Sequence, residues 1–230
     1  MAFNSFYILL IGFTLVSLLI QWRLRSKFSQ YSKIGLSSGL SGKQIAELML
    51  ADNKIHDVRV VSVEGRLSDH YNPTDRTVNL SAEVFDGRSA AAAAVAAHEC
   101  GHAVQHATAY NMLQFRSAMV PALSAVSRFM PFVLLAGVLM IRTTMIPLGL
   151  GIALFSLTTL FSFVTLPVEF DASKRALAWI DQRGIVTTQE HAMAKDALWW
   201  AAMTYVVAAI SSLATLLYYV SIFMSGNRRS

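Results

Sequence analysis

The stretch from Ala90 to Ala109, AAAAAVAAHECGHAVQHATA, decides the fold and contains the pattern His98-Glu99-Cys100-Gly101-His102. Its first eight residues are nearly all alanine and Ser89 precedes them as an N-cap, so the stretch is predicted to be a helix. Residues four apart share a helical face, so both imidazoles can point at one metal ion. Glu99, one position along, can reach a water molecule at that ion. This HExxH spacing is typical of zinc hydrolases; the alternative is two core histidines beside an unrelated glutamate.

The composition around this helix is that of a membrane protein. Of the 230 residues, 54% are hydrophobic and 14% are charged, and the mean hydropathy of +0.47 is too high for an ordinary soluble domain. Four segments are apolar over the roughly 20 residues that a span requires; they are residues 3–22, 118–141, 146–166 and 201–224. The predicted fold class is mainly α, a polytopic membrane protein with about four transmembrane helices and a small α+β zincin-like metallopeptidase module.

The basic residues predict how the chain is oriented. Residues 3–22 lack a basic start and a small-residue cleavage site, so they are interpreted as a retained signal anchor. Basic residues follow the first span and recur in both long polar stretches, whereas Arg228 and Arg229 lie on the opposite side. The positive-inside rule therefore predicts a multi-pass protein of the cell inner (cytoplasmic) membrane with its catalytic side in the cytoplasm.

The net charge and the cysteine count exclude other classes. The formal charge of +5 is explained by juxtamembrane basic residues facing anionic lipid, so membrane lipid is an expected partner and nucleic acid is not. Cys100 is the only cysteine, so no internal disulfide can form.

The polar stretch before the metal-binding helix is predicted to be a small α+β module. Residues 41–50 have helical spacing with Ser41 as a possible cap, and residues 58–63 alternate like a strand. Residues 67–71 and 77–80 flank a turn-rich tip, which predicts a β-hairpin. Zinc peptidases generally keep an exposed strand edge just before this helix, and such an edge can bind a peptide as an added strand. Equally, the hairpin could only cover the core.

A hydrolytic zinc site needs three protein ligands and one open position, so a third ligand must come from elsewhere. His106 continues the i+4 series but lies on the order of 12 Å from His98 along the helix axis, too far for one rigid helix to bring all three imidazoles to one ion. Thr108 stands where metzincins place their third histidine. His106 is therefore predicted to be a polar surface residue or one that supports a ligand.

Glu169 is the predicted third ligand. It lies just after the third span, where a helix is expected to begin at Pro167. Its helical face is otherwise made of small residues, Ala172, Ser173 and Ala176, which allow close packing against the HExxH helix. The alternative is an exposed acid at a helix N-terminus. Asp171 points roughly 160° away and is expected to orient a neighbour, cap the helix, or pair with Arg175.

Three segments, AAHECGHAVQ at 96–105, VEFDAS at 168–173 and SDHYNP at 68–73, resemble the bacterial YugP-type membrane zinc metallopeptidases over essentially the whole chain. More distantly the chain is similar to HtpX-like gluzincin peptidases, membrane proteins that cleave other membrane proteins. In that group the third ligand belongs to an E-x-x-A-D motif, which corresponds to Glu169. Ser173 replaces the final aspartate, so the resemblance leaves open which residue orients the first histidine.

These observations predict a zinc-dependent endopeptidase that acts on polypeptides, membrane-associated proteins in particular. One Zn²⁺ is bound by His98, His102 and Glu169, and Glu99 is the general base. Four residues are candidate donors to the oxyanion: His191, Arg175, His70 and Tyr71. The alternatives are a catalytically silent membrane scaffold, which has no need of Glu99, or a metal-binding regulatory protein, whose ligands would lie within the spans.

The predicted domain organisation follows from these assignments. It comprises an N-terminal transmembrane anchor (1–26), a peptidase module with the hairpin and the HExxH helix (27–117), two transmembrane helices (118–166), the third-ligand helix and a loop (167–198), and a C-terminal transmembrane helix and tail (199–230).

Overall fold

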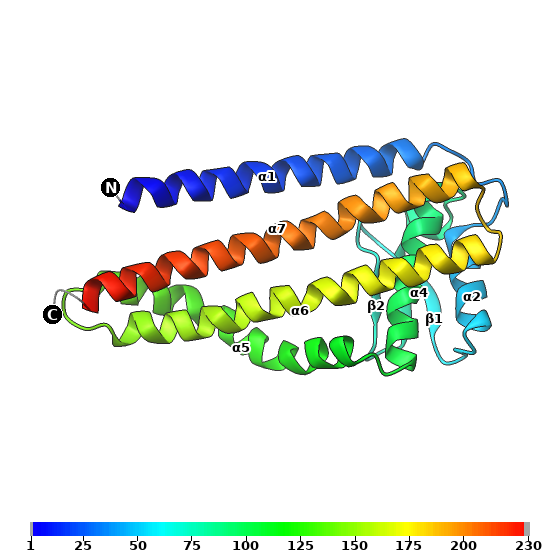
Figure 1. The fold of residues 1–230 in the computed structure, drawn as a ribbon. Helices are drawn as coiled ribbons and strands as arrows, with labels where there is room; N and C mark the ends of the chain where they lie inside the picture. The colour runs from blue at the N-terminus through cyan, green and yellow to red at the C-terminus, as the bar shows by residue number, and fades with distance from the viewer. Residues whose placement is uncertain (1, 228–230) are drawn as a thin grey trace. The chain divides into compact units, whose positions relative to one another are not determined.

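The computed structural model describes residues 2–227, which form ten helices and strands (Figure 1). The chain divides into two compact units. One comprises Met1–Leu18, Phe115–Leu166 and Thr204–Ser230 and is called here the helical unit. The other comprises Leu19–Gln114 and Pro167–Met203 and is called the sheet unit.

Four helices are long and apolar enough to cross a membrane, which confirms the predicted fold class. They are α1 (Ala2–Tyr31), α5 (Asn111–Leu139), α6 (Ile146–Gln182) and α7 (Thr188–Asn227). With 37 residues, α6 is about 55 Å long, far longer than the roughly 30 Å of a bilayer's hydrocarbon core. Its C-terminal part from Pro167 onward, which carries Glu169, belongs to the sheet unit.

Within the helical unit, glycines allow α5 and α6 to pack closely. A Cβ atom at Gly137 would lie 2.5 Å from the Cα of Leu148, and one at Gly151 would lie 2.6 Å from the side chain of Leu134. The hydroxyl groups of Thr159 and Ser212 are 2.7 Å apart. Small residues and paired hydroxyls are the usual means of helix association in a membrane, where the lipid competes for every apolar contact.

The helix expected to begin at Pro167 does not begin there. Helix α6 runs unbroken from Ile146 to Gln182, with Pro167 inside it. A proline removes one backbone hydrogen bond, and here the residues that follow it are held by tertiary packing, since Val168 and Ala172 are fully buried. The loop expected within residues 167–198 is correspondingly short, because α7 already begins at Thr188.

Two predicted caps are present in the sheet unit. Helix α2 (Gly42–Asp52) begins with a capping box: the amide of Gln44 donates to the Ser41 hydroxyl, and the Ser41 amide donates to the Gln44 side chain. Helix α4 (Ala90–Ala107), which carries the HExxH pattern, begins with the amide of Ala92 donating to the Ser89 hydroxyl at 3.2 Å. Both helix starts are therefore specified locally.

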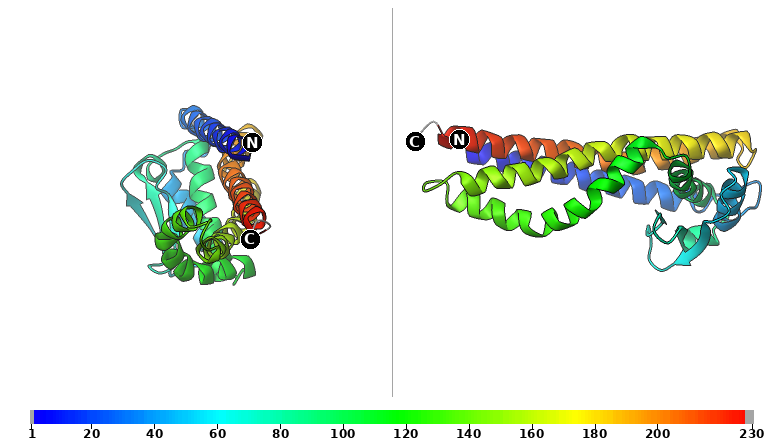
Figure 2. Two further views of the ribbon diagram at one scale, coloured as in Figure 1. Left: turned by 90° about the vertical axis from the view of Figure 1, so that its left-hand side faces the viewer. Right: turned by 90° about the horizontal axis from the view of Figure 1, so that it is seen from below.

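The sheet has three strands, β1 (Arg59–Val63), β2 (His70–Asn72) and β3 (Thr77–Ser81), in the order β1-β3-β2. Strands β2 and β3 form the predicted antiparallel hairpin, and β1 pairs with β3 in parallel. Strand β3, the last strand before α4, is thus central and fully buried. Within the hairpin, the strand at the edge of the sheet is β2. Figures 1 and 2 show the strands beside α4, which follows the short helix α3 (Ala82–Phe85).

The core of the sheet unit is built around the alanine-rich part of α4. Its alanines are buried against large side chains from α2 and β3, including Ile45, Met49, Val78 and Leu80. Because alanine adds little bulk to a helix, neighbouring elements approach α4 closely. This tight packing surrounds the HExxH residues with fixed neighbours.

Candidate metal centre

His98, His102 and Glu169 come together although 67 positions separate the last two in the sequence. Their ligand atoms all lie within 4.8 Å of one another. The carboxylate Oε2 of Glu169 is 3.4 Å from Nε2 of His98 and 3.6 Å from Nε2 of His102. Helix α4 supplies the two imidazoles from adjacent turns, and α6 supplies the carboxylate.

The geometry and chemistry of this group fit a zinc ion. Tetrahedral zinc with ligand bonds of about 2.0–2.1 Å places neighbouring ligand atoms about 3.4 Å apart, close to both observed distances. Glu169 is 3% exposed and His102 is 8% exposed. A divalent cation held by these three donors would lie against a largely buried carboxylate, where its charge is favourable.

The close approach of α4 and α6 depends on Gly101, between the two histidines. A Cβ atom at this position would lie 2.6 Å from the carbonyl oxygen of Ala172. On α6, Ala172, Ser173 and Ala176 are buried on the face that Glu169 shares. The predicted contact between two small-residue faces is therefore observed, and it places the carboxylate beside the imidazoles.

Gln105 holds His102 in one tautomer, a contact that the HExxH pattern does not predict. Its fully buried amide nitrogen donates to the Val168 carbonyl and to the Asp171 carboxylate, each at 2.8 Å. Its amide oxygen therefore faces Nδ1 of His102 at 3.0 Å, so that nitrogen must carry the proton. In the neutral ring, Nε2 then carries the lone pair that a metal ion would bind. Its position three residues after His102 was the available signal.

Ser173, which stands where the motif expected from the sequence has its final aspartate, lies beside His98. Its hydroxyl oxygen lies 3.1 Å from Nδ1 of His98. A hydroxyl can accept the Nδ1 proton as a carboxylate would, although without its charge. The residue beside the first histidine is thus Ser173 itself, one α-helical turn beyond Glu169.

Asp171 pairs with Arg175, which was one of the three roles predicted for it. The Nε of Arg175 lies 2.6 Å from the same carboxylate oxygen that accepts a hydrogen bond from Gln105. The Arg175 guanidinium also lies over the ring of Tyr110, 5.8 Å from its centroid. A chain of contacts therefore runs from Tyr110 to His102.

The charges of two glutamates shape the electrostatics of the site. Burial lowers the pKa of His102, but the adjacent Glu169 carboxylate and the negative charge of Glu99 outweigh burial, so this pKa lies above its usual value. Glu99 is 8% exposed and follows His98 on α4. A carboxylate is thus held close to the ligand group without being one of its three members.

The remaining candidates are outside the group of three ligand residues and also belong to the sheet unit. His106 is exposed, and its Nδ1 is 2.7 Å from the Tyr71 hydroxyl group. His70 is exposed on β2, with Nδ1 2.7 Å from the Ser68 carbonyl oxygen. His191 lines a cavity between α6 and α7. Arg175 and Tyr71 are therefore already engaged with Asp171 and His106, respectively.

Comparisons with known proteins agree with this chemistry. The model of the family described as "Putative neutral zinc metallopeptidase" matches residues 6–224. The chain is 43% identical over 206 residues to the "Putative membrane protease YugP" of Bacillus subtilis (strain 168), covering 90% of this chain and 91% of that protein. No solved structure matches the chain.

Proposed function

Because this chain belongs to the neutral zinc metallopeptidase family, we propose that it is a membrane-embedded zinc-dependent endopeptidase. The observation that carries the proposal is the group of His98, His102 and Glu169, whose donor atoms lie within 4.8 Å of one another. In this proposal the three side chains hold one zinc ion and leave one position open.

Glu99 is the proposed general base. A zinc ion bound by the three ligand side chains would polarise the peptide carbonyl and lower the pKa of a bound water molecule. The Glu99 carboxylate takes the proton from that water as it attacks the peptide carbonyl and then gives the proton to the leaving amine. Glu99 follows the proposed ligand His98 in the sequence and acts electrostatically on His102. Its carboxylate is therefore placed to take the proton and to return it at the same centre.

Other residues of the chain keep the ligands in position. Gln105 and Ser173 hold the Nδ1 atoms of His102 and His98, so both Nε2 atoms face Glu169. Fixed ligands preserve the open site for water, because a rotated imidazole would lose the metal. The sheet unit thus supplies a rigid centre for the chemistry.

The proposed substrates are polypeptides that lie in or near the membrane. Strand β2 pairs with β3 on one side, and its other edge is free to receive an extended peptide as an added strand. Residues 27–117 and 167–198 form the proposed catalytic region, and the basic residues around them favour the cytoplasmic side. Residues 1–26, 118–166 and 199–230 anchor this region in the bilayer, so membrane-associated proteins are the accessible substrate class.

A comparison of two variants tests this function. Purified in detergent, Glu99→Gln should keep its zinc but cleave a generic unfolded protein about 10²–10⁴-fold more slowly. Glu169→Ala should lose both zinc and activity, because two imidazoles alone bind zinc weakly. Zinc is quantified by elemental analysis and cleavage by peptide release.

The matched control is Glu64→Gln, which alters an exposed glutamate in the same unit and should leave zinc and activity unchanged. Full zinc and full activity in Glu169→Ala would show that Glu169 is not the third ligand. Full activity in Glu99→Gln would remove the general base from the proposal.

A further inference from the structure

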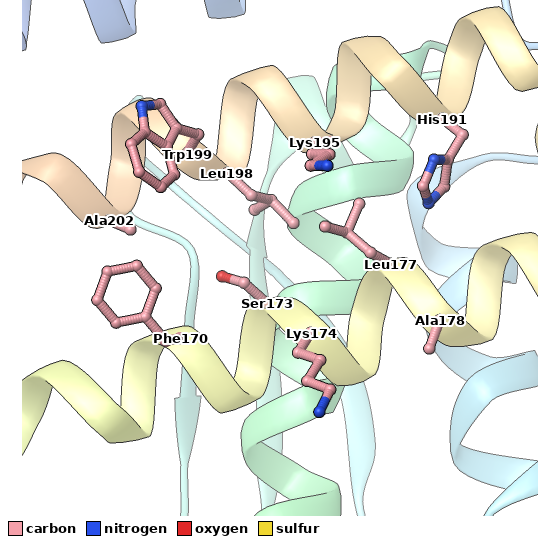
Figure 3. A pocket seen from close by; sticks show the side chains of 10 residues that line it. All are labelled: Phe170, Ser173, Lys174, Leu177, Ala178, His191, Lys195, Leu198, Trp199 and Ala202. Atoms are coloured by element: carbon pink, nitrogen blue, oxygen red, sulfur yellow. The ribbon is translucent and has the colours of Figure 1, made fainter.

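A cavity of about 390 Å³ lies between α6 and α7 in the sheet unit (Figure 3). Phe170, Trp199 and Ala202 form an apolar end of its wall, as Figure 3 shows. Ser173, which contacts His98, also lines it, so the cavity and the metal centre share one side chain.

The rest of the cavity wall combines apolar and basic side chains. Leu177, Ala178 and Leu198 line it together with Lys174, Lys195 and His191, and no acidic residue does. Within residues 2–227, the structure shows no ion pair or hydrogen bond for the ammonium group of either lysine. Neighbouring cations are paired, since Lys27 contacts Asp196 at 2.8 Å and Arg175 contacts Asp171. Lys195, on the α7 wall of the cavity with His191, is thus a cation available to a ligand.

The apolar end is suited to acyl chains. Phe170 is 39% exposed and Trp199 is 54% exposed, although both are large aromatic residues. In the sequence they adjoin the two charge-free stretches, 146–166 and 201–224. An exposed tryptophan beside an apolar span is the usual residue of the membrane–water interface.

We propose that this cavity binds the headgroup of an anionic phospholipid, with Lys195 and His191, one turn apart on α7, beside the phosphate and with Phe170 and Trp199 against the start of the acyl chains. Charge complementarity selects an anion, and the adjoining aromatic wall selects an amphiphile over a free phosphate ion. The site thus gives the enzyme a specific dependence on lipid composition, separate from its peptide chemistry.

Competition between lipids tests the proposal. The full-length protein is delipidated in neutral detergent and mixed with equimolar dioleoyl-phosphatidylglycerol and dioleoyl-phosphatidylcholine, and the retained lipid is counted by native mass spectrometry. Phosphatidylglycerol should be retained preferentially, and Lys195→Gln should weaken its retention about fivefold. The control Lys33→Gln, which alters an exposed lysine outside the cavity, should have no effect.

Fluorescence locates the bound lipid. Brominated phosphatidylglycerol should quench the wild-type protein more than the Trp199→Phe variant, and the difference should survive millimolar inorganic phosphate. Equal retention of the two lipids, an equal effect of Lys33→Gln, or displacement by inorganic phosphate would each overturn the proposal. So would a Lys195→Gln variant that retains phosphatidylglycerol normally and alters only the KM for an acidic peptide, since the cavity would then be a substrate subsite. The two lipid-binding readouts do not depend on peptidase activity.

Discussion

At the scale of single residues, the direction in which His102 points is set by a side chain that never reaches the ligand group. Gln105 is fully buried and uses both ends of its amide, with its nitrogen on Val168 and Asp171 and its oxygen on His102. Since both partners of the nitrogen are acceptors, the amide cannot flip without losing two hydrogen bonds. One glutamine therefore fixes which imidazole nitrogen is free for a metal.

We predict that Gln105→Leu lowers the zinc affinity of the protein. Leucine has a similar size but cannot accept a hydrogen bond from the Nδ1–H group of His102. The imidazole then loses its orientation, and the zinc affinity should fall about 10–100-fold. The affinity is measured by competition with a chromogenic chelator.

Gln189→Leu is the matched control, because Gln189 is an exposed glutamine of the same unit, and its zinc affinity should equal that of the wild type. A Gln105→Leu protein that is less stable but binds zinc with wild-type affinity would assign Gln105 to packing alone.

At the scale of secondary-structure elements, the centre depends on how closely α4 and α6 approach each other. The tightest point is Gly101 against the Ala172 carbonyl. A backbone carbonyl cannot rotate away as a side chain can, so any added atom at position 101 must separate the helices. Separation moves Glu169 away from both histidines.

We predict that Gly101→Ala destabilises the protein. The substitution gains up to about 1 kcal/mol of helix propensity, but overpacking against a backbone atom costs roughly 1–3 kcal/mol, and the immovable carbonyl places the cost at the upper end. The apparent Tm in detergent should fall by about 2–6 °C, and zinc content should fall with it.

Gly35→Ala provides the comparison, because a Cβ at Gly35 meets no atom within 4 Å. Its apparent Tm should stay close to that of the wild type. If Gly101→Ala raised the Tm and kept full zinc, helix propensity would dominate and the close approach would not be needed.

At the scale of the whole molecule, the site joins segments that the chain separates by two apolar helices. Between His102 on α4 and Glu169 on α6 lie α5 and the first part of α6, both long and apolar enough to cross a membrane. The proposed ligands therefore share one side of the bilayer only if both spans are crossed. The proposed metal centre therefore requires that the chain cross the membrane an even number of times between His102 and Glu169.

We predict that the sheet unit faces the cytoplasm, because basic residues follow the first span and flank the others. With a membrane-impermeant maleimide, Thr74→Cys at the hairpin tip should react only after permeabilisation, whereas Thr143→Cys between α5 and α6 should react in intact cells. Labelling is scored by a gel shift.

Native Cys100 is buried and supplies an unreactive background in both proteins. Reaction of Thr74→Cys in intact cells, with Thr143→Cys protected, would reverse the orientation.

Local sequence patterns predicted most of the elements. Alanine content and the two serine caps specified α2 and α4, and the turn residues specified the β2–β3 hairpin, because these signals act within a few residues. Pro167 suggests a helix start because proline is favoured in the first turn of a helix, which is also a local signal. Burial of the residues after Pro167, which no local pattern records, keeps α6 continuous.

The sequence by itself determined the apolar spans, the helical spacing of His98 and His102, and the small-residue face that carries Glu169. These follow from composition and from the 3.6-residue period of the α-helix. Only the tertiary structure decided which edge the sheet exposes and which neighbours orient the ligands. Gln105 and Ser173 meet the two histidines because α4 and α6 pack at Gly101, and contacts across two helices depend on that packing.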